Sequence, residues 1–294
     1  MNPFDYREPE TLDETLALLR EHGEDAKVIA GGTALIIMMK QRLVMPASLV
    51  SLRRLRGLDQ LEATNGELRL GALATHRTVE AASLVQTRVP MLAETYRRVA
   101  TIRIRNMATV GGALAHADPN QDPPVALLAL DARVQLASAA ARREVPLDAF
   151  FTDYYETALR PDELLTAVLI PLPAPHTGSV YLKFLPRTAD DYATVGIAAT
   201  VRIDPATRAC QDCRIAMGCV GPTPLRAREA EALARGAQLT PELLREVGAA
   251  AQRITDPISD ARGSAEYKRA MAGVFVRRAM EQAWQRALDA DHRG

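Results

Sequence analysis

Two pairs of adjacent glycines constrain this chain more than any other feature. Gly31-Gly32 lies between a short β-favouring run and a helix-tolerant run, and Gly111-Gly112 follows Thr109 in the same way. Glycines at such junctions let the backbone approach a ligand closely, and exposed N–H groups beside a helix N-terminus form a concave anion site. Two such turns can grip the two phosphates of a dinucleotide. Either turn alone is equally compatible with a plain turn in which glycine relieves crowding.

The spacing of these glycines excludes two common nucleotide sites. Neither turn matches the G-x-G-x-x-G fingerprint of nicotinamide sites or the G-x-x-x-x-G-K-[ST] pattern of NTPases. The 36 Lys and Arg residues balance the 36 Asp and Glu residues, so no global positive field attracts nucleic acid or an anionic membrane. A bound anion must therefore be held by local geometry.

Length and composition indicate a globular protein of two or three packed units, since the chain has 294 residues, 48% apolar and 24% charged. The longest apolar runs, Ala34 to Met39 and Val125 to Leu130, are far shorter than the roughly 20 residues that span a membrane. The first residues lack a secretion signal, so a cytoplasmic location is expected. Cys210, Cys213 and Cys219 do not form a disulfide framework and are expected to be reduced thiols.

Helical and strand patterns predict an α+β fold in three parts, at residues 1–55, 56–175 and 176–294. The first part has the pattern of a small βαβ-type unit. A linker containing Pro171, Pro173 and Pro175 precedes the third part, in which three strand patterns are followed by three helical ones. We therefore expect a C-terminal three-stranded antiparallel sheet with helices.

Local signals predict individual elements. Thr11 and Glu14 are spaced as a capping box, and Asn65-Gly66 favours a tight hairpin. The expected helices cover 11–22, 34–41, 78–85, 90–99 and 125–130, with three more beginning near residues 224, 241 and 264. The expected strands cover 27–30, 48–52, 60–64, 67–73, 133–137, 143–146, 164–170, 180–185, 193–203 and 212–220.

The segment from Thr101 to Pro124 is predicted to be irregular and functional. Asp118 and Asp122 lie in its Pro- and Asn-rich part, where a carboxylate can accept hydrogen bonds from ligand hydroxyls. The alternative is that both aspartates cap backbone N–H groups of a turn. Arg103 and Arg105 precede the second glycine turn and are candidates for docking an adjoining subunit, although a solvated basic face is the simpler interpretation.

Metal binding is not expected on this chain. Cys210, Cys213 and Cys219 lack a fourth ligand, and the histidines lack ligand spacing. His116, inside the irregular segment, is the histidine of most interest.

Three motifs together resemble one family. They are Val28-Ile29-Ala30-Gly31-Gly32-Thr33-Ala34-Leu35, Thr109-Val110-Gly111-Gly112-Ala113 with the following Ala115 to Pro119, and Asp191-Tyr192-Ala193. The chain resembles the FAD-binding medium subunit of molybdenum hydroxylases, the family of xanthine dehydrogenase and carbon monoxide dehydrogenase. The resemblance implies a vanillyl-alcohol-oxidase (PCMH)-type FAD-binding domain of two α+β subdomains, at 1–55 and 56–175, and a flavoprotein C-terminal domain at 176–294.

The resemblance also implies roles for particular residues. Val28 to Leu35 would wrap the FAD pyrophosphate through backbone amides, and Thr109 to Ala113 would meet it from the other side. Many relatives have polar residues where this chain has Ala34 and Ala113. The other implied contacts are a carboxylate at Asp122 for ligand hydroxyls, the Leu165 backbone at the adenine end, Lys183 near the cofactor, and Tyr192 beside the isoalloxazine ring.

The function implied is electron transfer. Electrons from a large molybdenum-cofactor subunit would pass through the [2Fe-2S] clusters of a small subunit to FAD on this chain, and then to an external acceptor, in a dimer of heterotrimers. No residue of this chain need then be a catalytic acid or base. The alternatives are a stand-alone FAD-dependent oxidase or reductase of the same fold, and a non-redox nucleotide-binding scaffold.

Overall fold

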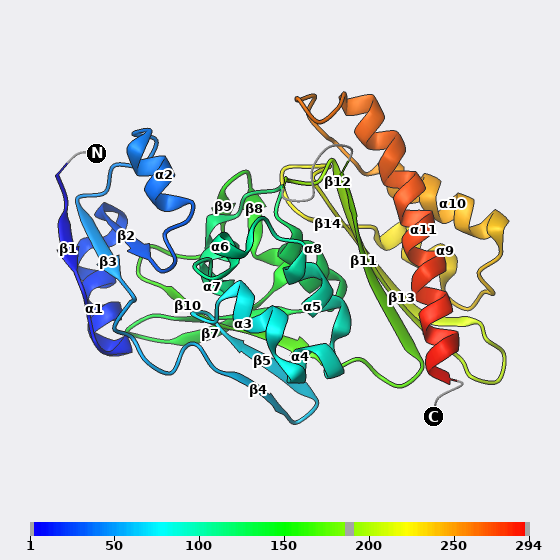
Figure 1. Cartoon of the computed structure of the whole chain (residues 1–294), viewed down its shortest axis with the longest axis horizontal. Helices are drawn as coiled ribbons and strands as arrows, with labels where there is room; N and C mark the ends of the chain where they lie inside the picture. The colour runs from blue at the N-terminus through cyan, green and yellow to red at the C-terminus, as the bar shows by residue number, and fades with distance from the viewer. Residues whose placement is uncertain (1–2, 186–190, 292–294) are drawn as a thin grey trace.

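The computed structural model describes residues 3–185 and 191–291, which form three α+β units in sequence order. Figure 1 shows the first unit in blue at one end, the second in cyan and green in the middle, and the third in yellow-green to red at the other end. The main sheets occupy residues 5–51, 61–171 and 177–226, so the expected boundaries near 55 and 175 fall between sheets.

The first unit is a parallel sheet of order β1-β3-β2. Its elements are β1 (Asp5–Arg7), α1 (Leu12–His22), the 3-10 helix η1 (Gly23–Asp25), β2 (Ala26–Ile29), α2 (Leu35–Lys40) and β3 (Ser48–Ser51). The expected capping box begins α1, because the Thr11 hydroxyl accepts from the Glu14 N–H at 3.2 Å and the Glu14 carboxylate accepts from the Thr11 N–H at 3.3 Å. The sequence reading missed β1, which is short and exposed.

The second unit is a five-stranded antiparallel sheet of order β4-β5-β10-β6-β7. Its strands are β4 (Leu61–Thr64), β5 (Glu67–Gly71), β6 (Arg133–Ala137), β7 (Arg142–Pro146) and β10 (Leu164–Pro171), with a separate ribbon of β8 (Phe151–Asp153) and β9 (Glu156–Thr157). The predicted hairpin turn has φ of 52° at Asn65 and 79° at Gly66, the left-handed conformations that a tight turn requires.

Helices cover this sheet, and two predictions about them were wrong. They are α3 (His76–Ala81), α4 (Ser83–Arg88), α5 (Pro90–Arg97), α6 (Ile102–Arg105), α7 (Val110–His116) and α8 (Asp122–Ala129), with the 3-10 helix η2 (Leu147–Ala149). The helix expected at 78–85 is two helices, because Ala82 is extended with ψ of 120°. The segment expected to be irregular contains α6, α7 and the start of α8.

The third unit is an antiparallel sheet of four strands, one more than predicted, in the order β11-β12-β13-β14. Its elements are β11 (Thr177–Phe184), β12 (Val195–Ile203), β13 (Cys210–Gly218), β14 (Leu225–Arg226), α9 (Arg228–Ala234), α10 (Pro241–Arg253) and α11 (Ala265–Asp291). One face of the sheet contacts α5 and α8 of the second unit, and the other contacts α11 and α9. The third unit is therefore fixed directly against the second.

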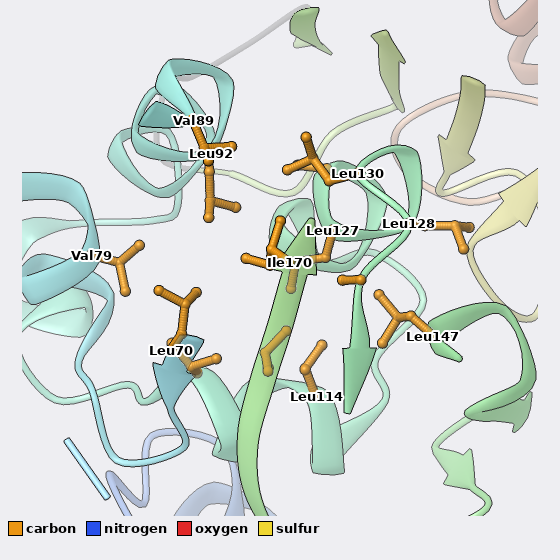
Figure 2. Close-up of a cluster of buried hydrophobic side chains, with 14 of the residues drawn as sticks. Leu70, Val79, Val89, Leu92, Leu114, Leu127, Leu128, Leu130, Leu147 and Ile170 are labelled. Carbon is orange, nitrogen blue, oxygen red and sulfur yellow. The ribbon is translucent and has the colours of Figure 1, made fainter. Parts of the chain in front are cut away.

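The largest hydrophobic core lies in the second unit. Figure 2 shows side chains from β5, β10, α3, α5, α7 and α8 converging there, including Leu70, Leu92, Leu114 and Ile170. Tyr181 of β11 belongs to the same buried cluster. Because this core spans the boundary between the second and third units, residues of both can contribute to one site.

Candidate functional site

The first glycine turn presents a row of amides that have no partner in the protein. Among the described residues, no acceptor pairs with the N–H groups of Gly31, Gly32, Thr33, Ala34 and Leu35. These five residues are half-buried. Gly32 has φ of 67°, a conformation that favours glycine. Half-buried N–H groups need an acceptor, and successive amides of this kind suit an anionic oxygen.

The second glycine turn is different, because its amides are used inside the protein. Val110 N–H donates to the Ala74 carbonyl at 2.9 Å, and Gly111 N–H donates to the Ala72 carbonyl at 2.8 Å. Gly112 N–H donates to the hydroxyl of Thr109 at 3.1 Å, which caps α7. Ala113 N–H donates to the Thr109 carbonyl at 3.0 Å. The sequence led us to expect that both turns offer backbone amides to phosphates. The second turn does not, because its amides already donate to acceptors inside the protein.

The two turns nevertheless touch each other. A Cβ on Gly31 would lie 1.9 Å from the carbonyl oxygen of Met107, so only glycine lets these backbones approach. A Cβ on Gly112 would lie 3.9 Å from Cβ of Ala30. Gly112 is itself exposed, whereas Gly111 is buried against Ala72. The amide row of the first turn thus lies beside the exposed face of the second turn.

This arrangement fits the diphosphate of FAD. The first turn would supply the donors, and Gly112 would leave the opposite wall open because it has no side chain. Half-buried backbone donors can hold an anion without a net positive charge on the protein, in agreement with the balanced composition of the chain.

Asp122 is the first residue of α8 rather than a loop residue, and it is buried. Its Oδ1 accepts from the Tyr181 hydroxyl at 2.5 Å and its Oδ2 accepts from Lys183 Nζ at 2.8 Å. Lys183 Nζ also donates to the Arg98 carbonyl at 2.9 Å. Burial raises the pKa of the Asp122 carboxyl, and the ammonium of Lys183 opposes that effect. The group joins the second and third units, and the Lys183 side chain is only 3% exposed rather than solvated.

Two glycines that the sequence reading missed make this contact possible. Gly196 of β12 and Gly218 of β13 are directly paired. A Cβ on Gly196 would lie 2.7 Å from the Tyr181 hydroxyl oxygen, and a Cβ on Gly218 would lie 2.4 Å from Cγ2 of Val125. The pair therefore makes room for Tyr181 to reach Asp122 and for α8 to lie on the sheet. Glycine inside a strand pattern was the available signal.

Tyr192 lies in a second group of polar and aromatic side chains at the same boundary. The guanidinium carbon of Arg262 is 5.4 Å from the centre of its ring, and Arg262 also pairs with Asp191 at 2.8 Å. Burial raises the pKa of the Tyr192 hydroxyl, and the Asp118 carboxylate adds to that effect. Tyr192 is nevertheless 43% exposed as a residue, so an external molecule can reach it. The sequence reading did not identify Arg262.

Asp118 behaves partly as a turn residue. Its Oδ1 accepts from the backbone N–H of Asn120 at 2.9 Å and from the Asn120 side chain at 3.1 Å. The ring of His116 lies 5.3 Å from that of Tyr155, which follows β8. Turn capping, the alternative considered for the aspartates, thus describes part of the environment of Asp118.

Leu165 lies in β10, where it is buried and pairs with Leu136 of β6. Its side chain belongs to the large core of the second unit, whereas that of the preceding Leu164 belongs to the cluster of the first unit. Leu165 is therefore at the junction of these two units.

The remaining residues that the sequence singled out, three cysteines and Arg105, are occupied by contacts within the fold. Cys210, Cys213 and Cys219 are free and buried. The described residues contain no group of three or more His, Cys, Asp or Glu able to hold a metal ion. Arg105 is not available for docking, because it pairs with Glu80 at 2.9 Å and donates to two backbone carbonyls. None of the described helices combines the length and apolar character needed to cross a membrane.

Comparison with known proteins identifies the family. Residues 2–173 match the FAD binding domain in molybdopterin dehydrogenase, and residues 180–283 match the CO dehydrogenase flavoprotein C-terminal domain. The carbon monoxide dehydrogenase medium chain of Hydrogenophaga pseudoflava is 36% identical over 96% of this chain and 98% of that protein. The carbon monoxide dehydrogenase medium chain of Afipia carboxidovorans is 38% identical over 97% of this chain and 98% of that protein.

The three-dimensional comparison agrees. A solved structure of carbon monoxide dehydrogenase from Hydrogenophaga pseudoflava that lacks the Mo-pyranopterin moiety has a TM-score of 0.93 to this chain, at 38% identity, covering 97% of this chain and 99% of that one. The expected fold, a PCMH-type FAD-binding domain followed by a flavoprotein C-terminal domain, is confirmed. On these matches over nearly its whole length, the chain belongs to the family of FAD-binding medium subunits of molybdenum-containing dehydrogenases.

Proposed function

We propose that this chain is the electron-transfer subunit of a heterotrimeric molybdenum hydroxylase or dehydrogenase. It receives electrons from the [2Fe-2S] centres of a small subunit and delivers them to an external acceptor. A large subunit with the molybdenum cofactor oxidises the substrate, and the assembly is a dimer of heterotrimers in the cytoplasm. The relatives named as medium chains support the multi-subunit part of this proposal.

The observation that carries the proposal is the row of unpaired amides in the first glycine turn. In our proposal the backbone of Val28, Ile29, Ala30, Gly31, Gly32, Thr33, Ala34 and Leu35 follows the FAD diphosphate, with the donors coming from Gly31 onward. The wall opposite is made by Thr109, Val110, Gly111, Gly112 and Ala113. These residues act mainly through shape, because their amides are bonded internally.

The other predicted contacts lie along the boundaries between units. Leu165 offers backbone at the junction of the first and second units, where we propose that the adenine end is held. Asp118 and Asp122 present carboxylates to ligand hydroxyls, and Lys183 fixes Asp122 from the third unit. FAD, when bound, supplies the redox chemistry. The chain itself orients the cofactor, and Tyr192 with its exposed ring controls which molecules reach it.

FAD retention in a glycine variant tests the amide row. Gly32→Val forces a β-branched residue to φ of 67° and places atoms near Cδ1 of Ile36 and of Ile29. We expect FAD to bind at least about tenfold more weakly, measured by titrating the stripped protein while following flavin absorbance. Gly66→Val is the matched control, because Gly66 has φ of 79° with no atom within 4 Å of a Cβ and lies in the hairpin turn. Equal FAD affinity in both variants would remove the proposed phosphate contact.

Purification from the native host tests the role. A flavin-containing chain that co-purifies with a molybdenum subunit and an iron–sulfur subunit is the expected result. A flavin-containing chain that is active alone would indicate a stand-alone oxidase or reductase. A colourless chain that binds ADP would indicate a nucleotide-binding scaffold without a redox step.

A further inference from the structure

Arg262 is a charged residue at the boundary between units to which the proposed function gives no role. It lies in the loop that precedes α11, where its backbone is held on both sides. Its N–H donates to Asp260 Oδ1 at 2.8 Å, and its carbonyl oxygen accepts from the Thr194 hydroxyl at 3.4 Å. Asp260 also pairs at 2.8 Å with Lys268, a buried residue in the first turn of α11. The loop therefore presents the Arg262 side chain from a fixed point.

The Arg262 side chain is tied to Tyr192 through two contacts. Its guanidinium carbon lies over one face of the Tyr192 ring, 5.4 Å from the ring centre. Its Nη2 donates at 2.8 Å to Oδ1 of Asp191, and the same oxygen accepts from the backbone N–H of Tyr192 at 2.7 Å. A guanidinium suits both contacts, because it is planar, stacks on aromatic rings and keeps its charge. One carboxylate thus connects the arginine to the backbone of the tyrosine whose ring it covers.

The hydroxyl end of Tyr192 is held from the second unit. Burial raises the pKa of this hydroxyl, and a hydrogen bond to the Asp118 carboxylate adds to the effect, so the hydroxyl stays protonated at neutral pH. Asp118 is itself fixed by the backbone and side-chain N–H groups of Asn120, at 2.9 and 3.1 Å. Arg262 and Asp118, which come from different units, therefore restrain the tyrosine at the face of its ring and at its hydroxyl.

These restraints matter because Tyr192 is not packed in a core. It is 43% exposed as a residue, and an exposed side chain without such contacts samples several rotamers. The guanidinium of Arg262 occupies one face of the ring. A flavin or an acceptor can therefore meet Tyr192 only at the opposite face or at the ring edge.

We propose that Arg262 is a positioning residue that holds the Tyr192 ring beside the flavin ring of FAD, an inference that rests on the function proposed above. In this role the arginine acts through Tyr192 and not on the cofactor. Loss of Arg262 frees the ring to leave the flavin, and the tyrosine then no longer governs access to it. The Asp191 carboxylate is part of the same device, because it orients the guanidinium.

Time-resolved flavin fluorescence of the assembled, FAD-loaded protein tests this role. A tyrosine ring in contact with a flavin donates an electron to the excited flavin and then takes it back, so the fluorescence decays within picoseconds. Arg262→Met removes the cation and keeps an unbranched side chain, whereas Arg262→Lys keeps the cation. Arg245→Met is the matched control, because Arg245 is an exposed arginine of the same unit that pairs with Glu242 on α10.

We expect Arg262→Met to retain FAD and to lower the amplitude of the picosecond phase at least about twofold, while the control behaves as the wild type does. Arg262→Lys should recover part of the amplitude. Asp191→Asn weakens the same contact without altering the Arg262 side chain, and should act in the same direction. Tyr192→Leu should abolish the phase, and Arg262→Met added to it should cause no further change.

Two results would overturn the proposal. One is a wild-type amplitude in both Arg262→Met and Asp191→Asn, and the other is an effect of Arg262→Met that persists in the Tyr192→Leu background. If Tyr192→Leu itself leaves the decay unchanged, the tyrosine does not lie beside the flavin, and the inference fails without affecting the electron-transfer role. Assembled protein that holds no FAD would instead remove the proposed function.

Discussion

The two glycine turns share a sequence pattern but use their amides in opposite ways. The N–H groups of Gly31 to Leu35 have no acceptor among the described residues, whereas those of Val110 to Ala113 all donate inside the protein. The second turn is held by a bridge between Thr75 and Thr109 and by the Thr109 cap, so its glycines serve close packing. The first turn leaves its donors for a ligand. A glycine pair in a sequence therefore indicates close approach, but not whether a ligand or another part of the protein approaches.

We expect the largest effect on stability and FAD binding from a substitution at the contact between the two turns. Gly31→Ala places a Cβ 1.9 Å from the Met107 carbonyl oxygen, so one backbone must move. We expect a loss of about 3 kcal/mol in the free energy of unfolding, measured by chemical denaturation, together with loss of FAD. Gly57→Ala is the control: it has φ of 82° and no atom within 4 Å of a Cβ, and should cost about 1 kcal/mol. Equal losses in the two variants would show that the turns are not in close contact.

We expect acid to lower the free energy of unfolding through His76, whose backbone is bonded to Ala108 just before the second glycine turn. His76 is 3% exposed, its backbone N–H donates to the Ala108 carbonyl at 2.9 Å, and burial lowers the pKa of its imidazole to about 4. Since the unfolded chain binds this proton more tightly, the stabilisation is complete above about pH 6.5 and is lost as the pH falls toward 4, by about 3 kcal/mol in all.

His76→Phe isolates this effect. The difference in free energy of unfolding between wild type and variant should be constant above pH 7 and should change between pH 6.5 and 4. Contributions from other titrating groups cancel in this difference. A difference that is independent of pH would mean that His76 is not held neutral by the fold.

Gly111 should affect stability rather than cofactor binding. A Cβ on Gly111 would lie 2.7 Å from Cβ of Ala72 and 3.0 Å from its carbonyl oxygen. We expect Gly111→Ala to lower the free energy of unfolding by roughly 1–2 kcal/mol while the folded protein retains FAD. Adding Ala72→Gly removes the nearer clash and should recover part of the loss. A folded, stable Gly111→Ala variant that has lost FAD would instead give this turn the ligand-binding role.

Local signals predicted much of the fold. The capping box at Thr11 and the Asn65-Gly66 hairpin depend on neighbouring residues, and both are present. The helix α7 was missed because glycines disfavour helix, whereas the Thr109 cap and packing on Ala72 stabilise it. Asp122 was assigned to a loop because of the prolines that follow it, although proline is well tolerated in the first turn of a helix.

The remainder of the site depends on distant partners. Lys183 is buried by contacts with Asp122 and with the Arg98 carbonyl, 61 and 85 residues earlier in the sequence. The Gly196 and Gly218 pair forms only when β12 and β13 align. Arg262 reaches Tyr192 and Asp191 from a loop 71 residues beyond that aspartate. These contacts join residues that are far apart in the sequence, so the periodicity or spacing of residues within one segment does not predict them.

Hydrogen exchange at individual amides, with and without FAD, tests the difference between the turns most directly. We predict that the amides of residues 31–35 exchange rapidly in the stripped protein and slow by at least about tenfold when FAD is added. The amides of residues 110–113 should already be slow without FAD and change little, since their acceptors belong to the protein. Protection that appears at 110–113 on adding FAD, with none at 31–35, would contradict the account.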